Sequence, residues 1–87
     1  MNFYIVGHIV NDRAKTDALI HKLHHLNAKK ILPALWVLKA SGTVRDLEGE
    51  LKTVIDMDDT LFVAEINSDC QYRNMLVSKV ELQAFFL

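Results

Sequence analysis

The sequence predicts an α+β domain in which four strands and two helices follow one another in the order βαββαβ. Apolar and polar residues alternate, as in half-buried strands, near residues 3–10, 30–32, 35–40 and 60–66. Apolar residues recur at helical spacing in residues 11–28 and 44–55. At 87 residues the chain fits one domain, with a core over residues 2–66 and a C-terminal extension over 67–87.

The first strand leads directly into the first helix. Asn11 or Asp12 can accept hydrogen bonds from the free amides that begin a helix. Asn27 is a common helix terminator. The apolar positions that define the inward face of this helix are Leu19, Ile20, Leu23 and Leu26.

A hairpin and a second helix follow. Pro33 cannot donate to a strand ladder, so it belongs in the bend between two strands. Thr43 and Asp46 resemble a capping box at the start of the second helix. The apolar stripe of that helix comprises Val44, Leu47, Leu51, Val54 and Ile55.

The segment 60–66 is apolar on both faces apart from Glu65, which predicts a central strand. Beyond it, Ser78 and Glu81 indicate a short capped helix, although residues 80–84 also alternate like a strand. The complete order βαββαβ is that of the ferredoxin-like fold, a scaffold that hosts many functions.

Size and composition predict a homodimer. A chain this short buries only about 60–65 % of the surface that its unfolded form exposes, and 51 % of its residues are hydrophobic. The first strand is apolar on both faces, so we expect a second subunit or the C-terminal segment to cover one of them. The expected interface residues are Tyr4, Val6, His8 and Trp36.

The charge balance argues against a domain that is basic overall. The sequence has ten Lys and Arg residues and eleven Asp and Glu residues, so the net charge is −1. Nucleic-acid binding would therefore need a local basic patch. Lysines at the end of a helix also interact favourably with its negative pole without any ligand. The candidate phosphate contacts are Arg13, Lys15, Lys29, Lys30 and Lys39.

Cysteine content and the N-terminal sequence predict the compartment. Cys70 is the only cysteine, which excludes an internal disulfide and favours a reducing environment. The chain opens directly into a strand without a signal-peptide pattern, and no apolar run approaches about 18 residues. We therefore expect a cytoplasmic protein without a membrane partner.

Four segments resemble the small CRISPR-associated endonuclease family, the non-integrase subunit of the spacer-acquisition complex, and its SinR-like and VapD-like relatives. They are FYIVGHIVN (3–11), LWVLK (35–39), DLEGEL (46–51) and IDMDDTLFV (55–63). The resemblance covers about residues 2–66 and implies a ferredoxin-like dimer. In this family each subunit contributes a strand-end carboxylate, and the pair holds a divalent cation for phosphodiester hydrolysis.

The chain departs from the family at that carboxylate. The corresponding positions resemble His8 and Ile9, and an isoleucine cannot coordinate Mg²⁺, which requires oxygen ligands. We therefore expect no catalytic residue and no cofactor. If a nuclease activity exists, His8 or Asp12 would have to replace the missing group and Mg²⁺ would be required.

A second candidate metal site lies on the first helix. Asp17, His21 and His25 recur every four residues and share one stripe. Two histidines at this spacing can chelate zinc. A solvated helix face explains the same pattern without a metal, and the sequence places no third strong ligand there, so we expect no metal site.

Three functional hypotheses follow. The first is a non-catalytic dimer that acts through association with protein or nucleic acid. The second is a metal-dependent or VapD-like endoribonuclease. The third is a phage or plasmid protein that uses the fold to engage a host complex.

Overall fold

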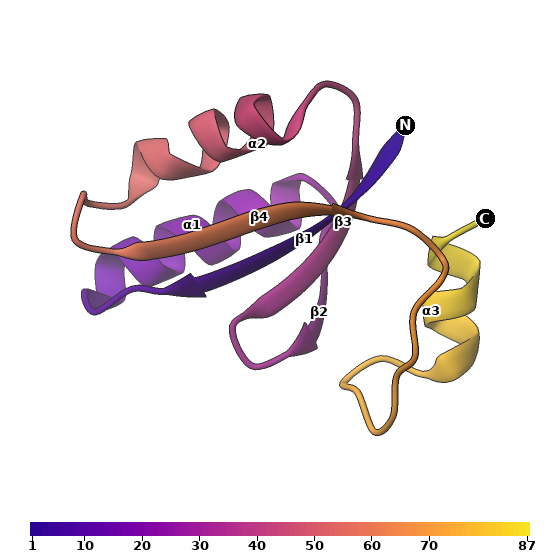
Figure 1. Cartoon of the computed structure of the whole chain (residues 1–87). Helices are drawn as coiled ribbons and strands as arrows, with labels where there is room; N and C mark the ends of the chain where they lie inside the picture. The colour runs from indigo at the N-terminus through magenta and orange to yellow at the C-terminus, as the bar shows by residue number, and fades with distance from the viewer.

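The computed structural model describes all residues, Met1–Leu87, and consists of four strands, three α-helices and one 3₁₀ turn (Figure 1). The elements are β1 (Asn2–Ile9), α1 (Arg13–His25), β2 (Lys29–Leu32), β3 (Leu35–Ala40), α2 (Val44–Leu51), η1 (Lys52–Val54), β4 (Thr60–Ile66) and α3 (Lys79–Phe85). The predicted order βαββαβ is therefore present, followed by a third helix.

The strands form one antiparallel sheet in the order β2-β3-β1-β4. β1 lies between β3 and β4, with Val6 opposite both Trp36 and Val63. The prediction that residues 60–66 form a central strand is wrong, because β4 is an edge strand. Its apolar residues point to both faces of the sheet. Val63 packs against the core cluster on one face, and Ile66 packs against the cluster on the other face.

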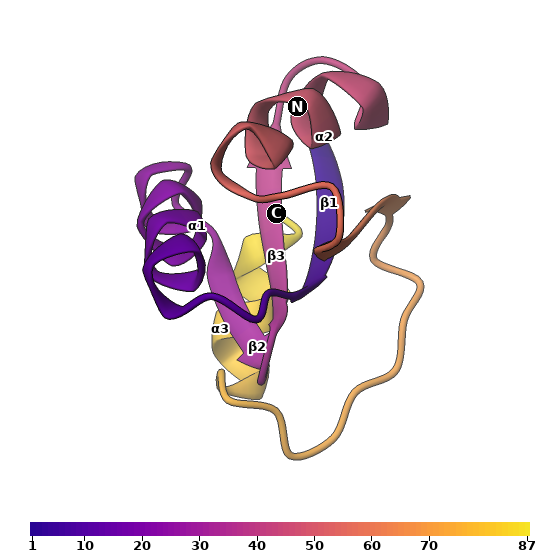
Figure 2. The same cartoon turned by 90° about the vertical axis from the view of Figure 1, so that its left-hand side faces the viewer.

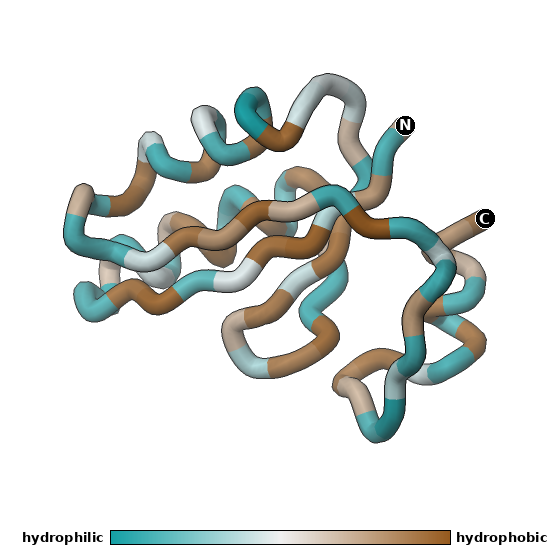
Figure 3. Tube along the Cα trace, viewed as in Figure 1, coloured by the Kyte–Doolittle hydropathy of each residue, from teal (hydrophilic) through white to brown (hydrophobic).

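One face of the sheet packs against α1 and α2, and we call it the first face. Figure 3 shows that hydrophobic and more polar residues alternate along the strands. The sheet contributes Tyr4, Val6, Trp36 and Leu38 to this core, and the helices contribute Leu19, Leu23, Leu47 and Leu51. The apolar stripes predicted for the two helices therefore include the residues that the structure buries.

The predicted interface residues need correction. Tyr4, Val6 and Trp36 retain at most 2 % of their surface exposed and belong to this internal core. His8 is also buried and lies in phase with Tyr4 and Val6 on the first face. Alternation along β1 was predicted correctly, but the helices of the same chain, and not a second subunit, cover this face.

The helix boundaries follow the predicted caps. Asp12 accepts a hydrogen bond from the Lys15 amide at 2.9 Å and begins α1. Asn27, at φ 60°, adopts the left-handed conformation just beyond its end. Thr43 and Asp46 form a reciprocal capping box at α2, with hydrogen bonds of 2.9 and 3.1 Å.

The C-terminal extension covers part of the opposite face, which we call the second face. Residues 67–78 form a linker without helix or strand that leads from β4 to α3 (Figure 2). The expected helix is present and Ser78 caps it through the Glu81 amide at 3.0 Å, so the alternative strand over residues 80–84 is wrong. The buried centre of this second cluster comprises Ile31, Val37, Leu82 and Phe85.

Two polar contacts join the linker and α3 to β2. The Leu76 amide donates to the Ile31 carbonyl at 2.9 Å. Lys29 pairs with Glu81 across 3.3 Å, but both side chains are partly exposed, so the pair contributes little to stability. Apolar burial therefore supplies most of the docking free energy of α3. None of the helices has the length and apolar composition needed to cross a membrane.

We predict that Phe85→Ala lowers the free energy of unfolding by about 3 kcal/mol, because it removes a buried ring from the second cluster. The ring centroid of Phe85 lies 5.4 Å from that of Phe3 and 5.0 Å from that of Phe86. Urea unfolding followed by circular dichroism measures the change. Gln83→Ala, on the exposed side of α3, is the control, and an equal midpoint for both variants would contradict the packing role.

Candidate functional site

His8 and Trp36 form a buried polar pair on the first face. The indole Nε1–H of Trp36 donates to Nε2 of His8 at 3.1 Å. The two residues come from the neighbouring strands β1 and β3, where alternation turns both side chains toward the helices. Because Nε2 accepts this hydrogen bond, His8 is neutral and its proton lies on Nδ1.

The surroundings of the pair favour this neutral form. Burial lowers the pKa of His8, and the positive charge of Lys30 on β2 lowers this pKa further. His24 of α1 packs edge-to-face on Trp36, with ring centroids 5.3 Å apart. The indole therefore contacts two imidazoles, and it donates a hydrogen bond to that of His8.

This geometry gives His8 a structural task. A general base needs a nitrogen lone pair that reaches the proton of a substrate. The Nε2 lone pair of His8 is already directed at the Trp36 indole, and only 9 % of the residue surface is exposed. The pair satisfies two polar atoms that would otherwise be costly to bury.

Asp12, the other candidate catalytic residue, lies at the start of α1 and acts as its N-cap. Nearby, Lys15 donates to the Asp56 carboxylate, and this hydrogen bond raises the pKa of Lys15. Asp12 and Asp59 add to the negative charge around Lys15. The candidate base therefore caps a helix beside an ion pair.

The five predicted phosphate contacts do not form one surface. Arg13 and Lys15 lie in the first turn of α1, while Lys29 and Lys39 line a hollow that α3 also borders. Lys30 pairs with Trp36 in the strand register and lies on the first face, where its charge lowers the pKa of His8. The structure thus places the five residues in three separate regions.

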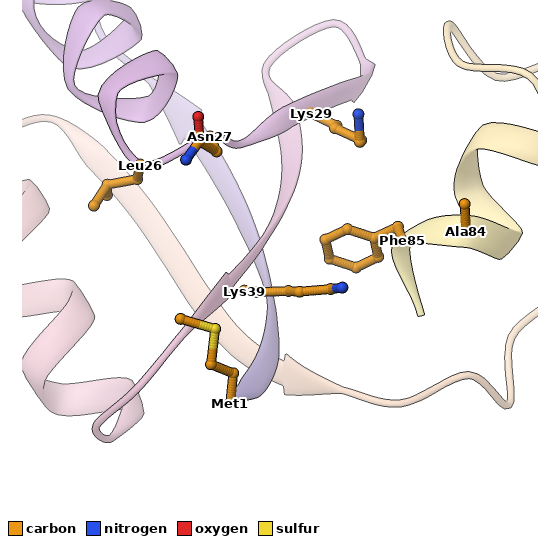
Figure 4. A pocket seen from close by; sticks show the side chains of 7 residues that line it. All are labelled: Met1, Leu26, Asn27, Lys29, Lys39, Ala84 and Phe85. Atoms are coloured by element: carbon orange, nitrogen blue, oxygen red, sulfur yellow. The ribbon is translucent and has the colours of Figure 1, made fainter. Parts of the chain in front are cut away.

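The hollow that contains Lys29 and Lys39 has a volume of about 420 Å³, and Figure 4 shows the Lys39 side chain extending toward Phe85. Lys39 Nζ lies 5.6 Å from the ring centroids of both Phe3 and Phe85, which is a cation–π distance. Lys29 is paired with Glu81. Both lysines therefore contact groups that hold α3 against the sheet.

The candidate metal ligands are exposed on α1. His21 and His25 border a shallow hollow that Glu50 of α2 also lines, whereas Asp17 does not border it. No three His, Cys, Asp or Glu side chains are arranged to hold a metal ion. The helical stripe seen in the sequence is present, but it forms no ligand cluster.

Sequence reasoning missed an exposed apolar patch on the second face, formed by Ile9 and Phe62. Ile9 is 65 % exposed and Phe62 is 61 % exposed. The register pairs Phe62 with Gly7, two residues before Ile9 on the same face of β1. The patch could not be assigned from the sequence, because the same face of β1 and β4 also carries apolar residues that the C-terminal extension covers. The sequence pattern does not distinguish the covered residues from the exposed ones.

Comparison of the sequence with protein-family models and with curated proteins gives no match.

We predict that protonation of His8 makes stability depend on pH. Folding lowers the pKa of His8 below its ordinary value of 6.5, so the unfolded chain binds the proton first. The contribution of His8 is then fully present above about pH 6.5 and is lost as the pH falls toward the lowered folded pKa. Urea unfolding between pH 5 and 8 measures this slope.

His8→Gln should reduce the slope, because its amide oxygen can still accept from the Trp36 indole but does not titrate. His21→Gln removes an exposed histidine and is the matched control. An unchanged slope in His8→Gln would show that other groups cause the pH dependence.

Proposed function

We propose that the protein is a non-catalytic association module that forms a homodimer through the exposed apolar patch of Ile9 and Phe62. This patch carries the proposal, since large apolar side chains grouped on a sheet face favour protein contacts. The C-terminal extension covers the neighbouring part of the second face but leaves both residues largely exposed. A second copy of the chain that packs there would bury the exposed surface of Ile9 and Phe62.

The edge strand supports the same surface. β4 has neighbours on only one side, contains no proline and carries a single charged residue, Glu65. Exposed strand edges of this kind pair readily with another chain. Phe62 lies in the middle of β4, so an approaching subunit would meet the edge and the patch together.

We propose further that the fold is ferredoxin-like and akin to that of the CRISPR-associated endonuclease family. α1 and α2 each connect two parallel strands that have a third, antiparallel strand between them, which is the split βαβ arrangement of that fold. The order β4-β1-β3-β2, counted from the β4 edge, supports this assignment. The four sequence segments described above support the family resemblance.

The non-catalytic part of the proposal depends on the residues near the end of β1. Ile9 occupies the position that resembles the family's carboxylate, and an alkyl side chain cannot bind a cation there. His8 accepts the Trp36 hydrogen bond and Asp12 caps α1. Each candidate catalytic group thus has a structural function that explains its presence.

We predict that the wild-type protein sediments at equilibrium with twice the 9.9 kDa monomer mass at micromolar concentration. Phe62→Asp should shift the equilibrium to the monomer, because a charge would be buried at the contact. Val80→Asp, at an exposed position of α3, is the matched control and should remain dimeric. A wild-type monomer at every concentration would refute the proposed dimer.

We predict that the wild-type protein does not cleave RNA or duplex DNA in the presence of Mg²⁺ or Mn²⁺. Ile9→Asp supplies the family's carboxylate at an exposed position and tests whether only this group is missing. Cleavage by the wild-type protein that Asp12→Asn abolishes would contradict the non-catalytic proposal. Asparagine is an equally good N-cap, so this variant removes the charge while keeping the cap of α1.

A further inference from the structure

A small apolar cavity lies between the second face of the sheet and the C-terminal extension. Its volume is about 170 Å³, and ten of its eleven lining residues are hydrophobic. Ile5, Val37 and Ile66 line it from the sheet, Tyr72 and Met75 from the linker, and Leu82 from α3. The cavity therefore lies within the second cluster and is separate from the Ile9–Phe62 patch.

The cavity is partly open to solvent, but its surface is almost entirely apolar. Atoms that line an unfilled apolar space lack contact partners on one side, which loses dispersion energy. Water that enters gains little, because an ordered water needs two or more polar partners.

The walls restrict the chemical class of an occupant. None of the lining residues carries a charge, and the polar groups are confined to the linker residues Cys70, Gln71 and Tyr72. A charged molecule would lose its hydration without gaining an ion pair. Apolar cavities of about 150 Å³ accept a molecule the size of benzene, so the volume suits one ring.

The linker supplies a route into the cavity. Cys70, Tyr72 and Phe86 line both this cavity and an adjoining outer hollow of about 360 Å³, which Ser68 and Gln83 also border. The linker has no helix or strand, and its Leu76 amide bonds to Ile31 on β2. The cavity and the outer hollow therefore adjoin at the residues that line both of them.

We propose that this cavity is a binding site for a small uncharged apolar molecule, of the size of one aromatic ring, which would be held between the sheet and the linker. The bound molecule restores the contacts that the second cluster lacks and so holds the C-terminal extension on the sheet. This site is independent of the proposed dimer, since neither Ile9 nor Phe62 lines it.

Toluene is the probe, and methyl resonances in ¹³C-labelled protein report its position. Saturable shifts are expected for Ile5, Val37 and Met75, whereas Leu19 and Leu23 in the first core should not shift. The melting temperature should rise with toluene concentration, because a ligand that binds only the folded state stabilises it. Absence of saturable shifts, or equal shifts in both cores, would overturn the proposal.

Two matched variants test the cavity itself. Ile66→Phe places a ring in the cavity and should abolish the toluene shifts, whereas Val80→Phe adds a ring at an exposed position and should leave them unchanged. If Ile66→Phe does not fold, Met75→Phe fills the same space from the linker. Wild-type affinity in the filled variants would overturn the site. Because the sedimentation experiment uses Phe62, failure of either proposal leaves the other intact.

Discussion

The need to cover two apolar faces of one sheet determines how this chain is built. β1 directs Tyr4 and Val6 to the first face, and Phe3 and Ile5 to the second. Two helices are enough for one face only, because both pack on the side of Tyr4. The C-terminal extension therefore has to supply the second cover, and its twenty-one residues (67–87) cover only part of that face. The covered part becomes a small second core, and the uncovered part leaves Ile9 and Phe62 exposed.

The two cores differ in how completely they are packed. Nine buried residues form the first core, in which His8 and Trp36 satisfy each other's polar atoms. The second has four buried residues surrounded by partly buried ones and borders the apolar cavity. A helix docked through a long irregular linker has fewer constraints on its position than one connected by short turns. We therefore expect motion to be concentrated in the C-terminal extension.

Local features could be predicted from the sequence, whereas long-range pairings could not. Asp12, Thr43 and Ser78 cap helices through hydrogen bonds to amides three residues away, so their spacing was visible in the sequence. The position of β4 depended on pairing with a strand more than fifty residues earlier, and apolar composition alone suggested a central strand. The hydrogen bond of His8 was likewise not predictable. The face of β1 on which His8 lies was clear from the alternation, but Trp36 could be identified as its partner only from the register of β1 and β3.

The interleaving of the strands has a consequence for cooperativity. β1 is hydrogen-bonded on both sides, to β3 and to β4, so each βαβ half of the chain depends on a strand from the other half. Neither half can retain its sheet when the other unfolds. The interior amides of β1 should therefore exchange with solvent only through unfolding of the whole sheet, whereas α3 can detach and leave this exchange unchanged. The four strands are thus expected to unfold together, whereas α3 can detach from the sheet independently.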